Sequence, residues 1–320
     1  MLGTRTAIAE VFAAIAVPED VHPQVDAIAT AALDWASACE IAGDAQQRAR
    51  LAAARFDRLA ARIFPTETIA DVSLLTQWTV WFFALDDQQD ESAPGPGAVR
   101  TVYDGLLDIL RNRKTPQTTT EKALVDLWAR TAPRMSVHWQ DRFIHHLERH
   151  RDAFLTQADN RSTGRVPTLA EYPDLRRRAN GEHMFDLFEV VRGAEIPEHV
   201  ACTRPWQDLF AASNDVTAWC NDILSVDREE RCGDTTNYVT VHSRALGCDR
   251  ASAIAHVGHR IRQRLLELQA LEPTALAEAR RLVGKDHDAG ASRMARVLVE
   301  LPGTHLGWLL ESGRYQPGLS

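Results

Sequence analysis

The chain has few cysteines and none of the patterns in which cysteines usually act together. Its five cysteines in 320 residues are an odd number, lie far apart and form no C-x-x-C pair. This argues against a zinc ribbon and against the disulfide framework of a small secreted protein. We therefore expect reduced thiols in a cytoplasmic protein.

Excess positive charge and long hydrophobic runs are also missing. The formal net charge is -8, so we expect no nucleic-acid partner and no broad basic face for an anionic membrane. The longest apolar run, around residues 78–85, is too short to span a bilayer, so no stable membrane insertion is expected. Glu10 interrupts the small apolar stretch near the N-terminus and Pro18 follows it. This favours a helical or flexible lead-in over residues 1–20 rather than a signal peptide.

No stretch shows the sustained alternation of apolar and polar residues that is typical of strands. Apolar residues instead recur at intervals of three and four in segments rich in good helix formers, which predicts helices. The expected helices cover residues 24–40, 44–63, 66–91, 98–113, 120–131, 135–157, 168–179, 182–192, 204–228, 233–245, 249–270, 273–284, 289–300 and 303–312. Breaks are expected at Pro65, Pro167, Pro197, Gly233, Pro273, Pro302 and in the segment 91–97. No repeat or long linker divides the chain, so we predict one all-α domain over residues 1–320.

An acidic cluster ends an apolar helix in the segment WTVWFFALDDQQDE. Asp86 and Asp90 are four residues apart and share one helix face, with Asp87 and Glu91 beside them. Like charges at this spacing destabilise a helix unless a cation lies between them, and Mg²⁺ commonly bridges carboxylates to substrate phosphates. The alternative is a solvated acidic helix end before a Pro/Gly loop.

Aromatic residues precede this acidic cluster at helical spacing. Phe82 and Phe83 lie one turn before Asp86, and Trp78 lies one turn before Phe82. Aromatic faces attract cations, so Phe82 and Phe83 are candidates for the wall of a pocket that holds a positively charged carbon skeleton. Core packing is an equal alternative for these two residues and the better interpretation of Trp78.

A second cluster of oxygen ligands occurs in the segment AWCNDILSVDREERCGD. Asn221, Ser225 and Glu229 are each four residues apart, so an amide, a hydroxyl and a carboxylate follow one helix face, with Arg228 next to them. Such a row suits one hard cation, and a polar helix exterior is the weaker alternative. Two such helices, distant in sequence, fit metals held between facing helices of a bundle.

Four segments together resemble those of bacterial class I terpene synthases. The run DDQQDE at 86–91 resembles the family's DDxxD motif, and NDILSVDRE at 221–229 is similar to its NDxxSxxxE triad. YPDLRRRANG at 172–181 and LLESGRYQP at 309–317 resemble two further family segments. The resemblance runs from about residue 60 to the C-terminus. It implies a single-domain class I terpenoid synthase bundle around a central active-site cavity.

The resemblance also implies a role for each matching residue. A set of three Mg²⁺ ions is expected, held by Asp86, Asn221, Ser225 and Glu229, with Asp87, Asp90 and Glu91 in support. The expected diphosphate contacts are the sensor Arg177, with Arg176 as the alternative, then Arg228 and the C-terminal pair Arg314 and Tyr315. Gly181 is expected at a helix break that exposes its carbonyl, with Asn180 as the linker, where the family often has Asp or Thr. Trp308 resembles a pocket aromatic, although core packing explains it almost as well.

The implied reaction is ionisation of an isoprenyl diphosphate and cyclisation of the carbocation, by a monomer or homodimer. Farnesyl diphosphate and a sesquiterpene are expected, with geranylgeranyl diphosphate and a diterpene as the alternative. The triad at 221–229 disfavours a chain-elongating prenyltransferase, and no DxDD motif of a class II cyclase is present. An inactive helical binding module of the same fold is the rival from another class. His146 and His150 share the spacing of some zinc sites, but the HExxH order is absent.

Overall fold

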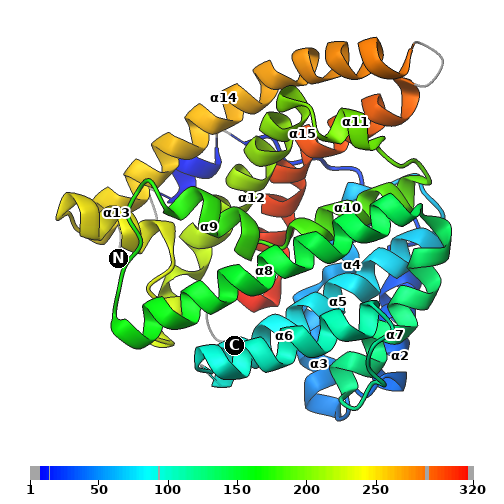
Figure 1. Ribbon diagram of the computed structural model, residues 1–320. Coiled ribbons are helices and arrows are strands. Elements are labelled where there is room, and N and C mark those ends of the chain that lie inside the picture. Colours follow the sequence, from blue (N-terminus) through cyan, green and yellow to red (C-terminus); the bar gives the residue numbers. More distant parts are fainter. Residues whose placement is uncertain (1–7, 14, 93, 285–287, 316–320) are drawn as a thin grey trace. The chain divides into compact units, whose positions relative to one another are not determined.

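All of the regular secondary structure in the described part of the protein is helical. The computed structural model describes residues 8–13, 15–92, 94–284 and 288–315, apart from the side chains of residues 89–92 and 288. Within these ranges no residue belongs to a β-strand, which confirms the all-α prediction (Figure 1). In the same ranges, no helix combines the length and apolar character that crossing a membrane requires.

The helices follow one another with short connections. In chain order they are α2 (Val25–Ala38), α3 (Ala45–Ala54), α4 (Phe56–Ile63), α5 (Ile69–Ser92), α6 (Pro96–Leu110), α7 (Thr119–Thr131), η1 (Ala132–Arg134), α8 (Val137–Thr163), α9 (Tyr172–Ala179), α10 (Glu182–Arg192), α11 (Glu198–Ala201), α12 (Arg204–Arg231), α13 (Tyr238–Leu246), α14 (Arg250–Val283), α15 (Asp288–Glu311) and η3 (Gly313–Tyr315).

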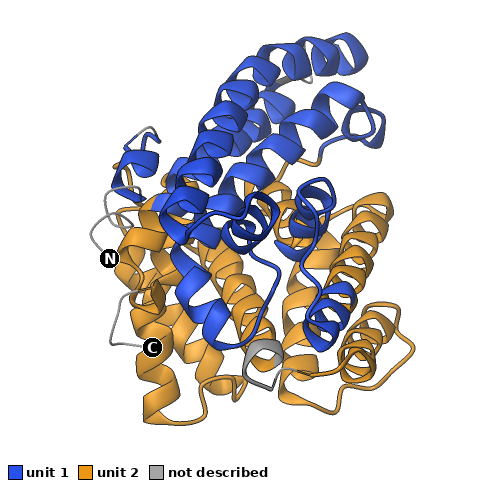
Figure 2. Cartoon of the chain, turned by 90° about the vertical axis from the view of Figure 1, so that its left-hand side faces the viewer, with its two compact units in different colours: residues 1–18, 156–180, 196–306 blue, residues 19–155, 181–195, 307–320 orange. Residues whose placement is uncertain are grey.

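The chain forms two compact units, which Figure 2 colours separately. Unit 1 comprises residues 1–18, 156–180 and 196–306, and unit 2 comprises residues 19–155, 181–195 and 307–320. The chain passes between the units several times, so neither is a continuous segment. The prediction of one catalytic domain over residues 1–320 stays a prediction.

Each unit is organised around one long helix that carries an expected ligand cluster. In unit 1, α12 packs against α9, α13 and α14. In unit 2, α5 packs against α2, α4, α7 and α10. Trp78 and Trp81 of α5 are fully buried, and their indole N–H groups donate to Thr131 Oγ1 and the Thr120 carbonyl, both at 2.9 Å. These bonds satisfy the polar end of each buried indole, so both residues belong to the core.

One expected continuous helix and two expected breaks were wrong, and several other helix ends are shifted by a few residues. The helix expected over residues 44–63 is interrupted at Arg55, whose φ of +53° is left-handed and ends α3. The breaks expected at Pro273 and Pro302 do not occur, because α14 and α15 run through these residues. Proline removes one helical hydrogen bond and crowds the preceding turn, but its φ is compatible with a helix. Packing along a long helix therefore outweighs that local cost.

The N-terminal lead-in is helical over residues 8–12. Val11 is 1% exposed and lies so close to Gly258 of α14 that a Cβ at Gly258 would be 2.1 Å from Val11 Cγ2. Both residues belong to unit 1. Glycine at position 258 therefore allows the lead-in to approach α14 closely.

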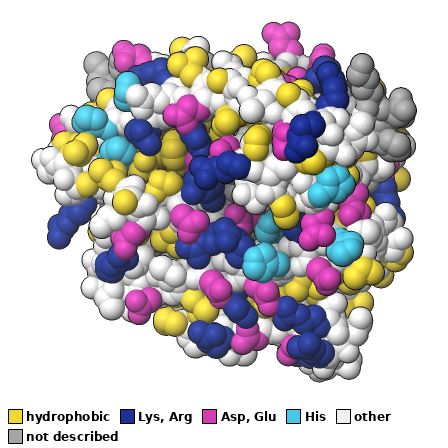
Figure 3. Space-filling view, turned by 45° about the horizontal axis from the view of Figure 1, so that its top comes forward, with side chains coloured by type: hydrophobic (Ala, Val, Ile, Leu, Met, Phe, Trp, Pro, Cys, Tyr) yellow, Lys and Arg dark blue, Asp and Glu magenta, His cyan; other side chains and the backbone are white. Residues whose placement is uncertain are grey.

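Charges of both signs are interspersed on the face shown in Figure 3, where acidic and basic side chains lie next to one another. Many of the ion pairs between described residues are local, such as Arg204 with Asp208 and Arg281 with Glu278. Exposed pairs of this kind contribute little to stability.

Candidate active site

The acidic cluster in unit 2 is neutralised by an arginine from the C-terminal segment. Arg314 of η3 donates from both terminal nitrogens to the Asp87 carboxylate, and its Nη1 lies 2.8 Å from Asp87 Oδ2. Its Nη2 is also 3.7 Å from Asp86 Oδ2. The structure thus brings together three residues from two of the four motifs. Asp90 and Glu91 lie on α5 as expected, and their side chains are outside the described part.

The same guanidinium also lies over an aromatic face. Arg314 Cζ is 4.9 Å from the centre of the Phe83 ring, and the Arg314 side chain is only 12% exposed. Burial lowers the pKa of Arg314, but the bond to Asp87 and the charges of its neighbours outweigh burial and raise it. A cation already rests between the carboxylates and the aromatic residue, so the electrostatics of this region suit positive charge.

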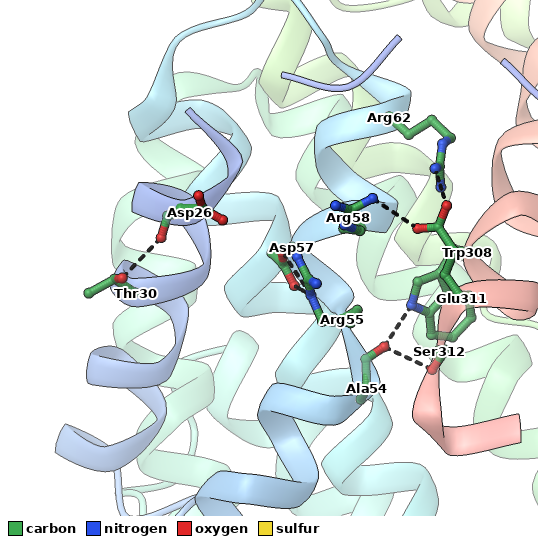
Figure 4. A network of polar contacts seen from close by, with 10 residues as sticks. All are labelled: Asp26, Thr30, Ala54, Arg55, Asp57, Arg58, Arg62, Trp308, Glu311 and Ser312. Carbon is green, nitrogen blue, oxygen red and sulfur yellow. Dashed lines mark hydrogen bonds and ion pairs between the residues drawn. The ribbon is translucent and has the colours of Figure 1, made fainter. Parts of the chain in front are cut away.

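The C-terminal segment is anchored where α3 ends, as Figure 4 shows. Trp308 Nε1 and Ser312 Oγ both donate to the carbonyl of Ala54, at 2.8 and 2.9 Å. The left-handed Arg55 interrupts the helix directly after Ala54, which leaves that carbonyl available. Glu311 adds ion pairs to Arg62 and Arg58 at 2.7 and 3.3 Å. Because Arg314 follows shortly after, these contacts fix its position.

Trp308 and Tyr315 are placed by aromatic contacts. The Trp308 ring centre lies 5.6 Å from those of Phe83 and Tyr315, and 5.7 Å from that of Phe56. Trp308 is fully buried, and these contacts are those of core packing. Its expected role in substrate binding stays a prediction.

The helix break expected at Gly181 is present. Gly181 has φ +82° and precedes α10, so a left-handed residue separates α9 from α10. A Cβ at this position would lie 2.8 Å from Phe82 Cε2, so the ring of Phe82 lies directly against the Gly181 backbone. Phe82 also contacts Phe83 and His183, with ring centres 5.5 and 5.6 Å apart. Phe82 and Phe83 are both half-buried, unlike the fully buried Trp308.

In unit 1, α12 carries the second cluster on one continuous helix. Asn221 Oδ1 accepts a hydrogen bond from Arg176 Nη2 at 3.1 Å, and Glu229 Oε2 accepts one from Asn237 Nδ2 at 2.7 Å. Between them, the Ser225 hydroxyl is buried and has no hydrogen-bond partner among the described residues. Arg228 is half-buried on the same helix.

The chemistry of this row fits a hard cation. Burial, followed by the negative charges of Asp222 and Asp234, raises the pKa of Glu229 to about 7. A buried hydroxyl without a partner and a carboxylate that is costly to ionise would both be stabilised by a divalent cation. The donor set of amide, hydroxyl and carboxylate oxygens is the type that Mg²⁺ prefers.

Arg176 and Arg177 have different surroundings. Arg176 Nε donates to Asp222 Oδ1 at 2.8 Å, while Tyr172 donates to the other oxygen of Asp222 at 2.5 Å. With its further bond to Asn221, Arg176 supports the second cluster. Arg177 instead donates from Nη1 to both oxygens of Asp215, at 3.0 Å each. This difference favours Arg177 over Arg176 as the arginine presented to an anion.

The sequence reasoning missed several residues that hold this region together. Asn180 Nδ2 donates to Asn214 Oδ1 at 2.9 Å, and Asp215 also accepts from Arg264 Nε of α14 at 2.9 Å. Burial raises the pKa of Asp215, although both arginines oppose the shift. One signal was available, because the consecutive polar residues SND at 213–215 interrupt an apolar helix.

The two histidines with zinc-like spacing have other partners. His146 Nδ1 lies 2.7 Å from Asp186 Oδ2, and Arg142 donates to Asp186 Oδ1 at 3.0 Å. His150 is buried, with its ring centre 4.6 Å from that of Phe154. These contacts place both histidines in the packing between α8 and its neighbours.

Comparison with known proteins agrees with the helical fold, which is that of class I terpene cyclases. The family model described as "Terpene synthase family 2, C-terminal metal binding" matches residues 77–267. This match covers more than half of the chain and includes both clusters of expected ligands, so the chain belongs to terpene synthase family 2, a family of enzymes.

Individual relatives agree with this assignment. The chain is 34% identical over 295 residues to a (-)-delta-cadinene synthase of Streptomyces clavuligerus, covering 89% of each protein. It is 28% identical to a (+)-T-muurolol synthase ((2E,6E)-farnesyl diphosphate cyclizing) of Roseiflexus castenholzii, covering 93% of this chain and 91% of that one. A solved structure of hedycaryol synthase in complex with HEPES matches with a TM-score of 0.80 and 25% identity, covering 92% of this chain and 96% of that one.

Proposed function

We propose that this terpene cyclase converts farnesyl diphosphate to a sesquiterpene, with Mg²⁺ as cofactor and diphosphate as the released product. The substrate proposal is supported by the relative from Roseiflexus castenholzii, whose printed name specifies (2E,6E)-farnesyl diphosphate. The observation that carries the metal proposal is the buried Ser225 hydroxyl without a partner, in the row that runs from Asn221 to Glu229.

The residues proposed to hold three Mg²⁺ ions are Asp86, Asn221, Ser225 and Glu229, with Asp87, Asp90 and Glu91 in support. When bound, Mg²⁺ neutralises charge on the diphosphate leaving group as a Lewis acid. Asn221 already points its amide oxygen at a cation, the guanidinium of Arg176. The side chain at position 221 is therefore oriented as a ligand of positive charge.

The chain's own arginines bind and orient the diphosphate in this proposal. Its oxygens are contacted by Arg177, Arg228 and Arg314, because guanidinium groups match phosphate geometry with paired hydrogen bonds. Tyr315 adds one hydroxyl donor. For Arg314 this contact replaces its bond to Asp87. The carboxylate then becomes available to support a metal ion, so substrate binding and metal binding favour one another.

In this proposal the faces of Phe82 and Phe83 stabilise the carbocation, and the Phe83 face that Arg314 now covers becomes available when Arg314 turns to the diphosphate. The Gly181 carbonyl accepts a hydrogen bond from Met184 N at 2.9 Å, so a contact with the carbocation requires this bond to open. Phe82 lies against the Gly181 backbone. In this proposal a shift at Gly181 is passed to Phe82, and Asn180 is linked to the sensor Arg177 through Asn214.

The test is to incubate the purified chain and Mg²⁺ separately with geranyl, farnesyl and geranylgeranyl diphosphate, with detection by gas chromatography–mass spectrometry. A cyclic C15 product from farnesyl diphosphate is expected. Selective turnover of geranylgeranyl diphosphate would instead identify a diterpene synthase, and folded protein that turns over none of the three would identify a binding module.

Two substitutions test the proposed ligands. Asp86→Ala and Glu229→Ala are each expected to abolish product formation and to leave the helical circular dichroism unchanged. Glu230→Ala is the matched control, because Glu230 is the exposed neighbour of Glu229 on the same helix. Full activity in either ligand variant would contradict the assigned metal roles.

A further inference from the structure

The C-terminal end of α9, which carries Arg177 and Asn180, is held by two consecutive residues of α12. Asp215 accepts two hydrogen bonds from Arg177 Nη1, and Asn214 contacts both Arg177 and Asn180. Asn214 is fully buried and Asp215 is 2% exposed. All four residues lie within unit 1.

The ion pair with Asp215 occupies only one nitrogen of the Arg177 guanidinium. Nη1 is 3.0 Å from each Asp215 oxygen, and Nε and Nη2 have no acceptor among the described residues. The Arg177 side chain is 24% exposed, whereas that of Arg176 is 12% exposed. Arg177 is thus fixed along one edge and keeps two donors for an anionic ligand.

Asn214 holds the backbone of the same turn. Its Nδ2 donates to the Arg177 carbonyl at 3.1 Å, and its Oδ1 accepts from Asn180 Nδ2 at 2.9 Å. One buried amide therefore uses its donor and its acceptor to join the sensor position to the linker position. The left-handed Gly181 follows directly.

We infer that Asn214 and Asp215 are positioning residues, which fix the Arg177 guanidinium and the turn from Arg177 to Asn180 for recognition of the diphosphate. This inference rests on the proposed role of Arg177. Both residues lie on α12 about two turns before Asn221. The helix that carries the second ligand cluster therefore also sets the geometry of the diphosphate sensor.

A purely electrostatic role for Asp215 makes the opposite prediction. Asp215 forms ion pairs with two arginines, Arg177 and Arg264, so these three side chains together carry one negative and two positive charges. If Asp215 only offsets positive charge, Asp215→Asn leaves the site more positive and diphosphate binds more tightly. If Asp215 positions Arg177, the same substitution releases the guanidinium and diphosphate binds more weakly.

The experiment measures binding of inorganic diphosphate to the full chain in Mg²⁺ by isothermal titration calorimetry, together with kcat and KM for farnesyl diphosphate. Asp215→Asn is expected to weaken diphosphate binding about 10- to 100-fold. This is the size of effect found when a residue that hydrogen-bonds and orients a metal-binding side chain is removed. Asp215→Glu keeps the charge but moves the carboxylate, so it is expected to weaken binding as well. Unchanged or tighter binding in Asp215→Asn would overturn the inference.

A double-mutant cycle tests whether Asp215 acts through Arg177. The single variant Arg177→Gln and the double variant with Asp215→Asn are expected to have diphosphate affinities within about twofold of each other. Once Arg177 is replaced, Asp215 no longer has a guanidinium to position. Additive losses would overturn the inference. Should Asp215→Asn fail to fold, Asp215→Glu replaces it in the cycle.

Asp186→Asn is the matched control for a general loss of stability. Asp186 is 4% exposed and is paired with Arg142 and His146 in unit 2, so its loss removes a comparable buried carboxylate. It is expected to lower the unfolding temperature and leave diphosphate affinity unchanged. A loss of affinity equal to that of Asp215→Asn would show a merely structural effect and overturn the inference.

The binding assay also separates this inference from the proposed function. If the proposed function fails, the wild-type chain itself does not bind diphosphate in Mg²⁺ and forms no terpene. If only the positioning role fails, the wild-type chain does both, and Asp215→Asn retains its affinity.

Discussion

Ser225→Ala is expected to make the metal-free protein more stable and the enzyme inactive. The Ser225 side chain is 1% exposed and its hydroxyl has no partner among the described residues. In the unfolded chain the same hydroxyl is hydrated, so folding loses its hydrogen bonds to water. Leaving a buried polar group unpaired costs about 1–3 kcal/mol.

The net gain is smaller than this cost, because the variant also loses a few packing contacts of the oxygen. We expect the free energy of unfolding of Ser225→Ala in EDTA to rise by about 1 kcal/mol. For a cooperative chain of 320 residues, this corresponds to about 1.5 °C in unfolding temperature. Urea unfolding followed by circular dichroism measures the change.

Ser213→Ala provides the matched control. Ser213 lies on the same helix and is also fully buried, but its hydroxyl donates to the Leu298 carbonyl at 2.5 Å. Its removal is expected to lower the free energy of unfolding by about 1 kcal/mol, the usual contribution of a satisfied hydrogen bond. The two serine substitutions should therefore have opposite signs.

Addition of Mg²⁺ and diphosphate should reverse this order, so that wild type becomes more stable than Ser225→Ala. A ligand present at 100 times its dissociation constant stabilises a folded protein by about 2.7 kcal/mol. Wild type should gain such a shift from Mg²⁺ with diphosphate, and Ser225→Ala should gain much less and form no terpene. If Ser225→Ala is destabilised in EDTA, or is stabilised by Mg²⁺ and diphosphate as strongly as wild type, the argument from the unpaired hydroxyl is wrong.

Three further substitutions test other parts of the structure. Gly181→Ala forces a side chain into a left-handed conformation against Phe82, so thermal unfolding should show a loss of about 1–2 kcal/mol and kcat should fall. Burial, followed by the charges of His256 and Arg260, lowers the pKa of His242 to about 4. As the pH falls below 6.5, His242 therefore takes up a proton in the unfolded state but not yet in the native state. This difference in proton binding destabilises the native state. Between pH 6 and 5, wild type should lose about 1 kcal/mol more stability than His242→Phe in urea titrations. Trp308→Phe removes a hydrogen bond to Ala54; its unfolding free energy should fall by about 1 kcal/mol, and a fall in kcat without any loss of stability would contradict the anchoring role.

The helical class and the helices that carry the proposed ligand residues were predictable from the sequence, because both depend on short-range spacing. Apolar residues at intervals of three and four predicted α5 and α12 to within a few residues. The intervals of four from Asn221 to Glu229 placed three oxygen donors on one helix face. A Gly after the RRRAN run predicted the break at Gly181, which the structure contains.

The errors lie where tertiary packing overrides local preference. Pro273 and Pro302 are strong local signals for a helix end, yet both lie inside helices. Arg55 carries no local signal for a break, yet it has a left-handed backbone that leaves the Ala54 carbonyl to Trp308 and Ser312. The partners of that carbonyl are some 250 residues further along the chain, so no local pattern contains them.

The sequence by itself determined that the two rows of proposed ligand side chains lie on helices, since helical periodicity is a property of neighbouring residues. Only the tertiary structure decided which arginine faces which carboxylate: Arg314 pairs with Asp87, Arg176 with Asp222, and Arg177 with Asp215. Such pairing depends on distances between helices that are remote in sequence. Charge alone cannot select among many equivalent arginines and aspartates, and packing makes that selection.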